Sequence, residues 1–147
     1  MIRAVLDTDV VVAAFRSDSG ASRRVLEAAL DREVTMLVSV PLMLEYESVL
    51  TRSDQLQQSG LTVGQSNIVL DAVAAVAERV PLRFLWRPLL RDANDEMVLE
   101  TAVNGRADCL ITFNMRHLSA AAKEFGIRAI LPRDFLKSFG ESKHAKK

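Results

Sequence analysis

Apolar residues along the chain follow two patterns: short continuous runs and longer segments with helical spacing. The short runs are bounded by polar residues or glycine and predict buried β-strands at residues 2–6, 35–38, 109–112 and 128–130. Apolar residues spaced three and four apart predict helices at about 22–30, 41–50, 62–80, 96–104, 117–125 and 132–139. This alternation predicts a single three-layer α/β/α domain with a mostly parallel central sheet.

Three further segments are less regular. Residues 10–15 are too short and too apolar to assign, and they fit either a short helix or a continuation of the first strand. Residues 55–60 are polar and predict a connector. Residues 82–86 predict a short edge strand.

The bulk composition fits one globular domain. The chain has 147 residues, of which 49% are hydrophobic and 26% charged, and neither a linker nor a repeat divides it. We therefore expect one folded domain over 1–140, followed by a basic tail at 141–147. The tail either frays or attracts phosphate weakly through its lysines.

The sequence indicates neither a membrane protein nor a secreted one. The lone Cys109 cannot form an internal disulfide, and its apolar surroundings predict a buried thiol in a reducing compartment. No apolar run approaches the roughly 18 residues of a membrane span. Acids at Asp7 and Asp9 interrupt any signal-peptide pattern near the N-terminus. We therefore expect a cytoplasmic protein with no membrane partner.

Charge along the chain is balanced, with 19 basic and 19 acidic residues. A nucleic-acid partner would therefore have to be bound by local basic patches, not by the field of the whole molecule. Each basic residue alone is more often a solvated surface residue. Candidates for such patches are Arg16, Arg23, Arg24, Arg52, Arg87, Arg91, Arg116 and His117.

The placement of the acidic residues is the most informative feature of the sequence. In open parallel sheets, ligands bind beyond the carboxyl ends of the strands. Asp7 follows the first predicted strand, Asn114 follows the strand at 109–112, and Asp95 precedes a helix. Glu45 lies about one turn into the helix after the second strand. These side chains can converge on one crevice from distant positions in the sequence.

Clustered carboxylates favour a hard divalent cation. Packed together they repel one another, and without a cation some of them would take up protons. Mg²⁺ removes that repulsion and prefers oxygen ligands. A bound ion can polarise a phosphoryl oxygen and help to generate hydroxide, and a second ion roughly 4 Å away can stabilise the leaving oxygen. Such a site needs no serine, cysteine or histidine nucleophile.

Four segments resemble the successive motifs of PIN-domain nucleases, namely LDTDVVVAAF, PLMLEYESVL, RDANDEMVLETAV and ADCLITFNMRHL. The likeness runs from about Ile2 to Phe139, and it is greatest to the VapC-like toxins of type II toxin–antitoxin pairs. The resemblance implies a parallel sheet flanked by helices, with Mg²⁺ or Mn²⁺ as cofactor. It also implies hydrolysis of phosphodiester bonds in single-stranded or loop RNA.

Position by position, the resemblance makes Asp7, Glu45 and Asp95 the catalytic, metal-binding acids of the site. Thr112 and Asp92 are candidates to orient those acids without binding the metal themselves. For an RNA substrate, the basic residues of the local patches that we expect to contact it are Arg16, Arg87, Arg91, Arg116 and His117.

Two positions depart from the family pattern. The fourth acidic position is occupied by Asn114, which can ligate a metal through its carbonyl oxygen or position water but brings no negative charge. This substitution weakens any second metal site. Asp9 stands where the family commonly has Asn, and it either supports Asp7 or adds charge.

A toxin-like protein would also have protein partners. The resemblance implies a small antitoxin that occupies the crevice, and a homodimer. Leu56, Leu61 and Val69 are apolar positions of the helical pairs that serve either dimerisation or the core.

Each acid also has an explanation without catalysis. Asp7 and Asp9 fit a polar turn after a strand, and Glu45 fits a surface position like that of its neighbour Glu47. Asp95 fits a first-turn acid that complements the helix dipole.

Two other functions are compatible with parts of the sequence. LDTDVV also resembles the nucleophile motif of haloacid-dehalogenase-type phosphatases, in which Asp7 would attack phosphorus and Asp9 would act as acid and base. That interpretation leaves Glu45 without a role and provides few lysines for the site. The second is a PIN-like module that binds RNA or protein and has lost activity with its fourth acid.

Overall fold

The computed structural model describes residues 1–83 and 92–145, with side chains up to residue 140. The strands within these ranges are β1 (Arg3–Leu6), β2 (Thr35–Val38), β3 (Glu78–Arg79), β4 (Cys109–Ile111) and β5 (Arg128–Ile130). The helices are α1 (Thr8–Arg16), α2 (Ala21–Leu30), α3 (Val40–Leu50), α4 (Ser53–Ser59), α5 (Val63–Val76), α6 (Ala93–Asn104), α7 (Met115–Glu124) and α8 (Pro132–Ala145).

The strands form one sheet in the order β3-β2-β1-β4-β5. Every strand pairing in the described part of the chain is parallel. β1 lies at the centre and pairs with both β2 and β4, with Ala4 opposite Met36 on one side and Cys109 on the other. The predicted parallel α/β sheet is therefore confirmed, and the carboxyl ends of β1 and β4 lie side by side.

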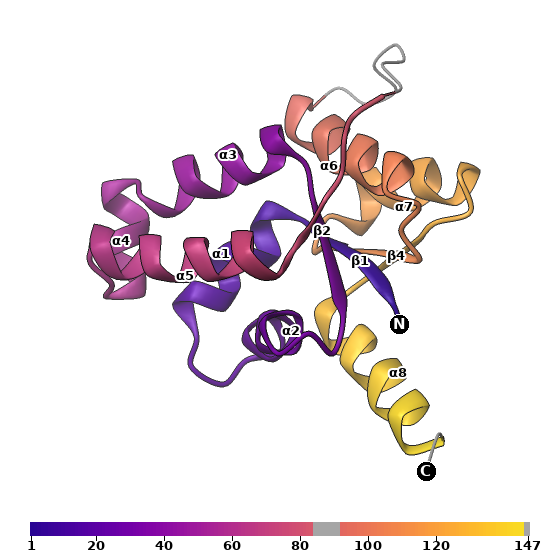
Figure 1. The fold of residues 1–147 in the computed structure, drawn as a ribbon, viewed down its shortest axis with the longest axis horizontal. Coiled ribbons are helices and arrows are strands. Elements are labelled where there is room, and N and C mark those ends of the chain that lie inside the picture. The colour runs from indigo at the N-terminus through magenta and orange to yellow at the C-terminus, as the bar shows by residue number, and fades with distance from the viewer. Residues whose placement is uncertain (84–91, 146–147) are drawn as a thin grey trace.

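Helices cover both faces of this sheet. Figure 1 shows α6 and α7 on one side of the strands and α2 and α8 on the other, while α3, α4 and α5 extend away from them. Because both faces are covered, β4 is buried at every position and β1 is buried from Ala4 onward. The predicted three-layer arrangement follows from this burial.

Several segments differ from the sequence-based expectations. Residues 10–15, left open between helix and strand, belong to α1. The predicted connector at 55–60 is largely the short helix α4. The helix predicted at 62–80 ends at Val76, and Glu78–Arg79 within that range form the strand β3. The edge strand predicted at 82–86 falls mostly outside the described residues. Residues 82 and 83 have no regular structure, and 84–86 lie outside the described residues.

The ends of α2 and α8 differ from the boundaries predicted from the sequence. The helix predicted from residue 22 begins at Ala21, with Gly20 at the N-cap position and Ser22 buried inside the helix. At the other end of the chain, α8 continues to Ala145 instead of stopping near Phe139. The Phe135 and Phe139 rings of α8 stack with their centroids 5.7 Å apart. Pro132 begins this helix, as predicted.

Cys109 behaves as predicted from its apolar surroundings. It is a free, buried thiol on β4, and burial raises its pKa to about 12. None of the described helices combines the length and the apolar character that crossing a membrane requires.

Candidate active site

Asp7 connects the central strand to the first helix. It follows β1 directly and is the N-cap residue of α1, where its Oδ1 accepts a hydrogen bond of 2.7 Å from the Thr8 backbone N–H. Its own backbone N–H donates to the carbonyl of Ile111 at 2.9 Å, which fixes the end of β1 against β4. The side chain is only 5% exposed. Sheet and helix together thus hold the carboxylate in one orientation.

Thr112 holds the second oxygen of the same carboxylate. Its buried hydroxyl donates to Asp7 Oδ2 at 2.7 Å and accepts from the Asn114 backbone N–H at 2.8 Å. Thr112 follows β4, so the two ends of neighbouring parallel strands are joined through one hydroxyl group. The predicted supporting position of Thr112 therefore has a specific contact.

Asp9 lies two residues after Asp7, in the first turn of α1, and lines the same cavity. Its Oδ2 accepts a hydrogen bond of 3.1 Å from the Phe113 backbone N–H. Its Oδ1 is buried and has no hydrogen-bond partner among the described residues. Burial, followed by the charge of Asp7, raises the pKa of Asp9 to about 7. Among the described residues, Asp9 therefore forms no ion pair that would compensate its charge.

Asp95 comes from the other side of the sheet. It lies in the first turn of α6, where Asp92 caps the helix by accepting from the Asn94 N–H at 2.8 Å and the Asp95 N–H at 3.3 Å. Asn114 Nδ2 donates to both Asp95 carboxylate oxygens, at 3.1 Å each. Asp92 is exposed and acts on Asp95 through the helix cap.

Burial raises the pKa of Asp95, a shift that the hydrogen bond from Asn114 partly opposes. Burial is also the main cause of the raised pKa of Asp7, and the charge of Asp95 raises it further. Asp7, Asp9 and Asp95 therefore influence one another electrostatically. Such a cluster would be relieved by a cation.

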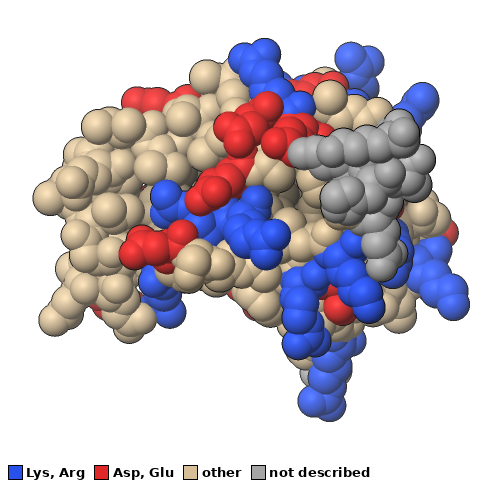
Figure 2. Space-filling model, turned by 90° about the horizontal axis from the view of Figure 1, so that it is seen from below, with Lys and Arg blue, Asp and Glu red and all other residues tan. Residues whose placement is uncertain are grey.

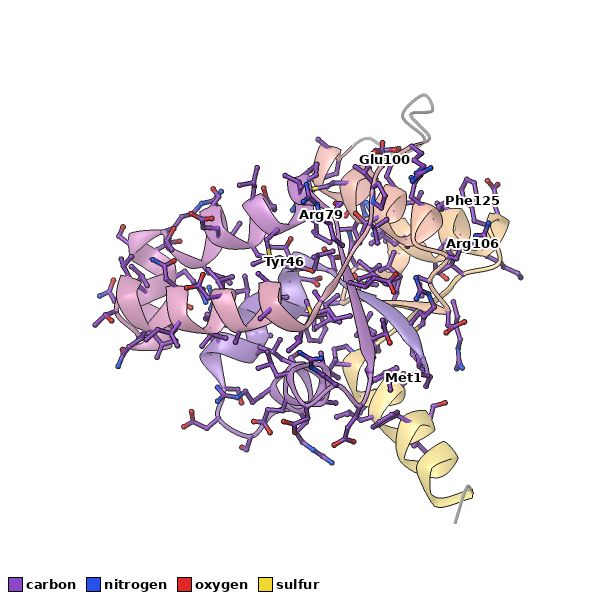
Figure 3. The ribbon with its side chains drawn as sticks, viewed as in Figure 1. Met1, Tyr46, Arg79, Glu100, Arg106 and Phe125 are labelled. Carbon is purple, nitrogen blue, oxygen red and sulfur yellow. The ribbon has the colours of Figure 1, made fainter. Side chains whose placement is uncertain are left out.

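Glu45 reaches the site from α3. Its neighbour Tyr46 lies inside the molecule and donates a hydrogen bond from its hydroxyl to the Leu6 carbonyl, which ties α3 to the end of β1 (Figure 3). Burial raises the pKa of the Tyr46 hydroxyl well above its ordinary value, so it remains a donor. Glu45 itself is half-buried, whereas Glu47 is exposed. The two neighbouring acids on α3 therefore occupy different environments.

These acids share one open cavity of about 870 Å³ at the carboxyl edge of the sheet. Five acidic and two basic side chains line it, together with apolar and neutral polar ones. The lining residues are Asp7, Thr8, Asp9, Val12, Ala13, Arg16, Glu45, Val49, Arg52, Asp92, Asn94, Asp95, Phe113 and Asn114.

The predicted cations are only partly in this cavity. Arg16 lines it, as does Arg52 at the start of α4. Arg116 and His117 are exposed on α7 and do not contribute to the lining, although the His117 side chain helps to lower the pKa of Asp95. Arg87 and Arg91 lie outside the described residues.

The donor set suits a hard cation but does not form a complete ligand cage. The described residues contain no group of three or more Asp, Glu, His or Cys side chains arranged to hold one metal ion. The unpaired Asp9 Oδ1 and the raised pKa values of Asp7 and Asp9 nevertheless indicate uncompensated negative charge. All the acidic donors in the cavity are oxygens, which are the ligands that Mg²⁺ and Mn²⁺ prefer.

Two residues of the site were not found from the sequence. Phe113 is 50% exposed at the cavity, and it lies just beyond the strand predicted at 109–112, where no pattern marks it. Gln55 is buried on α4 and accepts a hydrogen bond from Arg16. No local pattern signals this contact, because the two residues are 39 positions apart.

These features define a parallel α/β domain with an acidic cavity at the carboxyl edge of its sheet. The family model described as the PIN domain matches residues 3–116. The chain belongs to the PIN domain family, which removes the support for a phosphatase of the haloacid-dehalogenase type. No curated protein matches the chain.

The fold also resembles a solved structure. VapBC2 from Rickettsia felis, bound to a DNA fragment from its promoter, superposes with a TM-score of 0.56 at 16% sequence identity. The match covers 87% of this chain and 97% of that chain. At this identity the likeness concerns the fold.

Proposed function

We propose that the protein is a metal-dependent endoribonuclease that hydrolyses phosphodiester bonds of single-stranded or loop RNA. The observation that carries this proposal is the cluster of Asp7, Asp9 and Asp95, three electrostatically coupled carboxylates in one open cavity. PIN domains are generally nucleases that use divalent metals, which supports the same reaction class.

Each side chain has a part in this mechanism. Asp7, Asp95 and Glu45 would hold Mg²⁺ or Mn²⁺, with Asn114 contributing its carbonyl oxygen. When bound, the ion would supply a polarised phosphoryl oxygen and an activated water. Thr112 would keep the Asp7 carboxylate in place, since it already holds one of its oxygens.

The remaining residues would act on the substrate and on the charge of the site. Asp9 supplies a further carboxylate beside Asp7, and Arg16 attracts the RNA backbone. We also propose contacts from Arg116 and His117, which are exposed on α7. Arg87 and Arg91 remain candidates for the same role from the sequence alone.

We further propose that the protein is the toxin of a toxin–antitoxin pair, inhibited by a small antitoxin that covers the acidic cavity. The similarity of its fold to the VapBC2 structure supports this assignment. A homodimer fits the apolar side chains that remain exposed, among them Leu44 on α3 at 59% and Ile68 on α5 at 69%. Leu61 and Val69 instead pack partly against the core. Light scattering of the purified protein at micromolar concentration tests the dimer, which a monomer would contradict.

The first experiment is RNA cleavage by purified protein with Mn²⁺, Mg²⁺ or EDTA. Asp7→Asn keeps the size of the side chain and removes its charge, so we expect cutting to require metal and to be abolished by this variant. Asp71→Asn, at an exposed position on α5, is the matched control and should cut as well as wild type. Cleavage that persists in EDTA or in Asp7→Asn would contradict the proposal.

The alternative is a PIN-like module that binds RNA or a partner protein without cutting. The observation in its favour is Asn114, which brings no charge and uses its amide to hold Asp95. Its signature would be RNA binding that survives Asp7→Asn, with no cutting by wild type under any metal condition.

A further inference from the structure

Arg16 and Arg52 are the basic side chains among the residues that line the acidic cavity. Five carboxylates line the same cavity and repel a phosphodiester backbone wherever no cation lies between them. Binding of a polyanionic substrate in this cavity therefore depends on how these two guanidinium groups are oriented. For Arg16, the structure shows what fixes that orientation.

Arg16 lies in the last turn of α1, and its Nε–H donates to Gln55 Oε1 on α4 at 2.7 Å. This contact uses only the Nε edge of the guanidinium. In the described part of the chain, the Nη1 and Nη2 groups have neither a hydrogen-bond partner nor an ion-pair partner. The groups that carry most of the N–H donors of Arg16 therefore remain available to an anion.

Arg16 is held by an uncharged partner, Gln55, and this affects the charge at the cavity. Arg3 provides the contrast, because its guanidinium is bound by the Glu78 carboxylate and by the Gly105 carbonyl. Its charge is compensated within the fold. Gln55 holds Arg16 without neutralising it, so the full positive charge stays at the cavity.

Stability of the fold alone does not explain why a glutamine occupies position 55. Its side chain is only 3% exposed, and an arginine N–H can only donate, so Gln55 Oε1 must face Arg16. Gln55 Nε2 is then buried without a hydrogen-bond partner among the described residues, which costs free energy. An apolar residue of similar size would avoid that cost. The basic residue at the end of α1 also complements the helix dipole without any help from Gln55.

We propose that Gln55 is a positioning residue that orients Arg16 as a subsite for an RNA phosphate beside the carboxylates. This inference rests on the proposed ribonuclease function and extends it to α4. The short helix α4 then has a specific task, since it brings Gln55 against Arg16 and carries Arg52 at its N-terminal boundary.

The test compares Gln55→Leu and Gln55→Glu with Gln57→Glu, an exposed position on the same helix. We expect Gln55→Leu to raise KM for a single-stranded RNA oligonucleotide roughly 10-fold, with kcat within about 2-fold of wild type. Gln55→Glu neutralises Arg16 and should raise KM similarly, while Gln57→Glu makes the same charge change without effect. Gln55→Leu should also melt at or above the wild-type temperature, which a purely structural role would not allow.

A double-mutant cycle shows whether Gln55 acts through Arg16. In the Arg16→Ala background, Gln55→Leu should have no further effect on KM. The slope of log Kd against log salt for the same RNA should decrease by about 0.7 in either single variant, as expected for one lost phosphate contact. Arg128→Ala, at the exposed first position of β5, is the control for loss of one charge.

The outcomes separate this inference from the proposed function. If wild type cuts RNA and the Gln55 variants match Gln57→Glu, the positioning role is wrong and the nuclease stands. If wild type cuts nothing, anisotropy with the same labelled RNA decides. Binding weakened by Gln55→Leu would support the subsite in a non-cutting protein, and undetectable or unchanged binding would overturn it.

Discussion

Thr112 is an uncharged side chain on which the geometry of two acids depends. Its hydroxyl joins Asp7 to the segment that carries Asn114, and Asn114 in turn holds Asp95. Thr112→Val keeps the shape of the side chain and removes both hydrogen bonds. We expect it to lower the free energy of unfolding by about 1–3 kcal/mol. RNA cleavage should fall roughly 10–100-fold, as for lost contacts behind metal ligands.

Thr112→Ser is the matched control, because it retains the hydroxyl and loses only a methyl group. It should preserve most of the cleavage activity. Urea unfolding measures the free energy, and initial cleavage rates at saturating Mg²⁺ measure the activity. A Thr112→Val protein with wild-type activity would show that the Asp7 carboxylate needs no second contact.

The raised pKa of Asp9 predicts how the stability of the metal-free protein depends on pH. Its pKa is about 7 in the folded state and about 3.9 in an unfolded chain. Between these values the folded state binds more protons than the unfolded state, so stability falls as pH rises from about 4 to about 7. Asp9→Asn should remove this part of the slope. Relative to wild type, the variant should therefore be more stable at pH 8 than it is at pH 4.

The measurement is thermal melting in EDTA at both pH values. Asp9 is partly solvated, so we discount its contribution to about 1 kcal/mol at pH 8. This corresponds to roughly 2–4 °C in Tm for a domain of this size. Asp71→Asn serves as the control for loss of one exposed charge. An equal difference between wild type and Asp9→Asn at both pH values would contradict the shifted pKa.

The strand ends are the part of the site that the sequence predicts well. Asp7 and Thr112 each follow an apolar run, and parallel pairing of those runs brings their side chains within 2.7 Å. Arg16 and Gln55 could not be paired in this way. Their contact depends on how α4 packs against α1, and seven mostly polar residues give no periodicity that would reveal this packing.

At the scale of elements, a buried hydroxyl pair sets the position of α3 relative to α6. Ser39 Oγ caps α3 by accepting from the Leu42 N–H at 3.3 Å and lies 2.8 Å from Thr101 Oγ1 on α6. α3 carries Glu45 and α6 carries Asp95, so this pair fixes two sides of the acidic cavity. We expect Ser39→Ala to cost about 1–2 kcal/mol of stability through the lost cap and hydrogen bond.

A double-mutant cycle with Thr101→Val tests the link itself. Thr101 also donates to the Met97 carbonyl, so its single variant should be destabilising too. The two hydroxyls share one contact, so the losses in free energy of unfolding should not add. The loss in the double variant should be smaller than the sum of the two single losses by at least about 0.5 kcal/mol. Additive losses measured by urea unfolding would show that the two helices are positioned independently.

The elements that the sequence predicts less well are those with little apolar periodicity. The two residues of β3 are exposed, so no alternating pattern marks this edge strand. Ser22 is of a residue type that often caps helices, yet it is buried inside α2 and Gly20 is the N-cap residue. In both cases tertiary packing decides what local preference leaves open.

At the scale of the whole molecule, charge is balanced. Figure 2 shows Asp and Glu side chains gathered near the middle of one face, with Lys and Arg side chains beside them and a further group of Lys and Arg side chains at the lower right. A net charge of zero gives no general attraction to RNA. Attraction to RNA therefore depends on local groups of basic side chains, such as the lysines of the tail.

Removing residues 141–147 tests the proposed division into a domain and a tail. The deletion takes away three lysines and one glutamate, so the formal net charge falls from zero to −2. Phe135 and Phe139, which anchor the described part of α8, are retained. We expect the free energy of unfolding to change by no more than about 0.5 kcal/mol.

RNA affinity should decrease in the truncated protein at low salt and approach that of the full chain at high salt, because the lost contacts are screened charge interactions. Replacing Lys143, Lys146 and Lys147 with Gln in the full chain is the matched control and should reproduce the loss without shortening α8. If only the truncation weakens binding, α8 itself is required and the boundary at residue 140 is wrong. If neither change affects binding at low salt, the tail is not a phosphate-attracting arm, and attraction to RNA depends on the cations at the cavity.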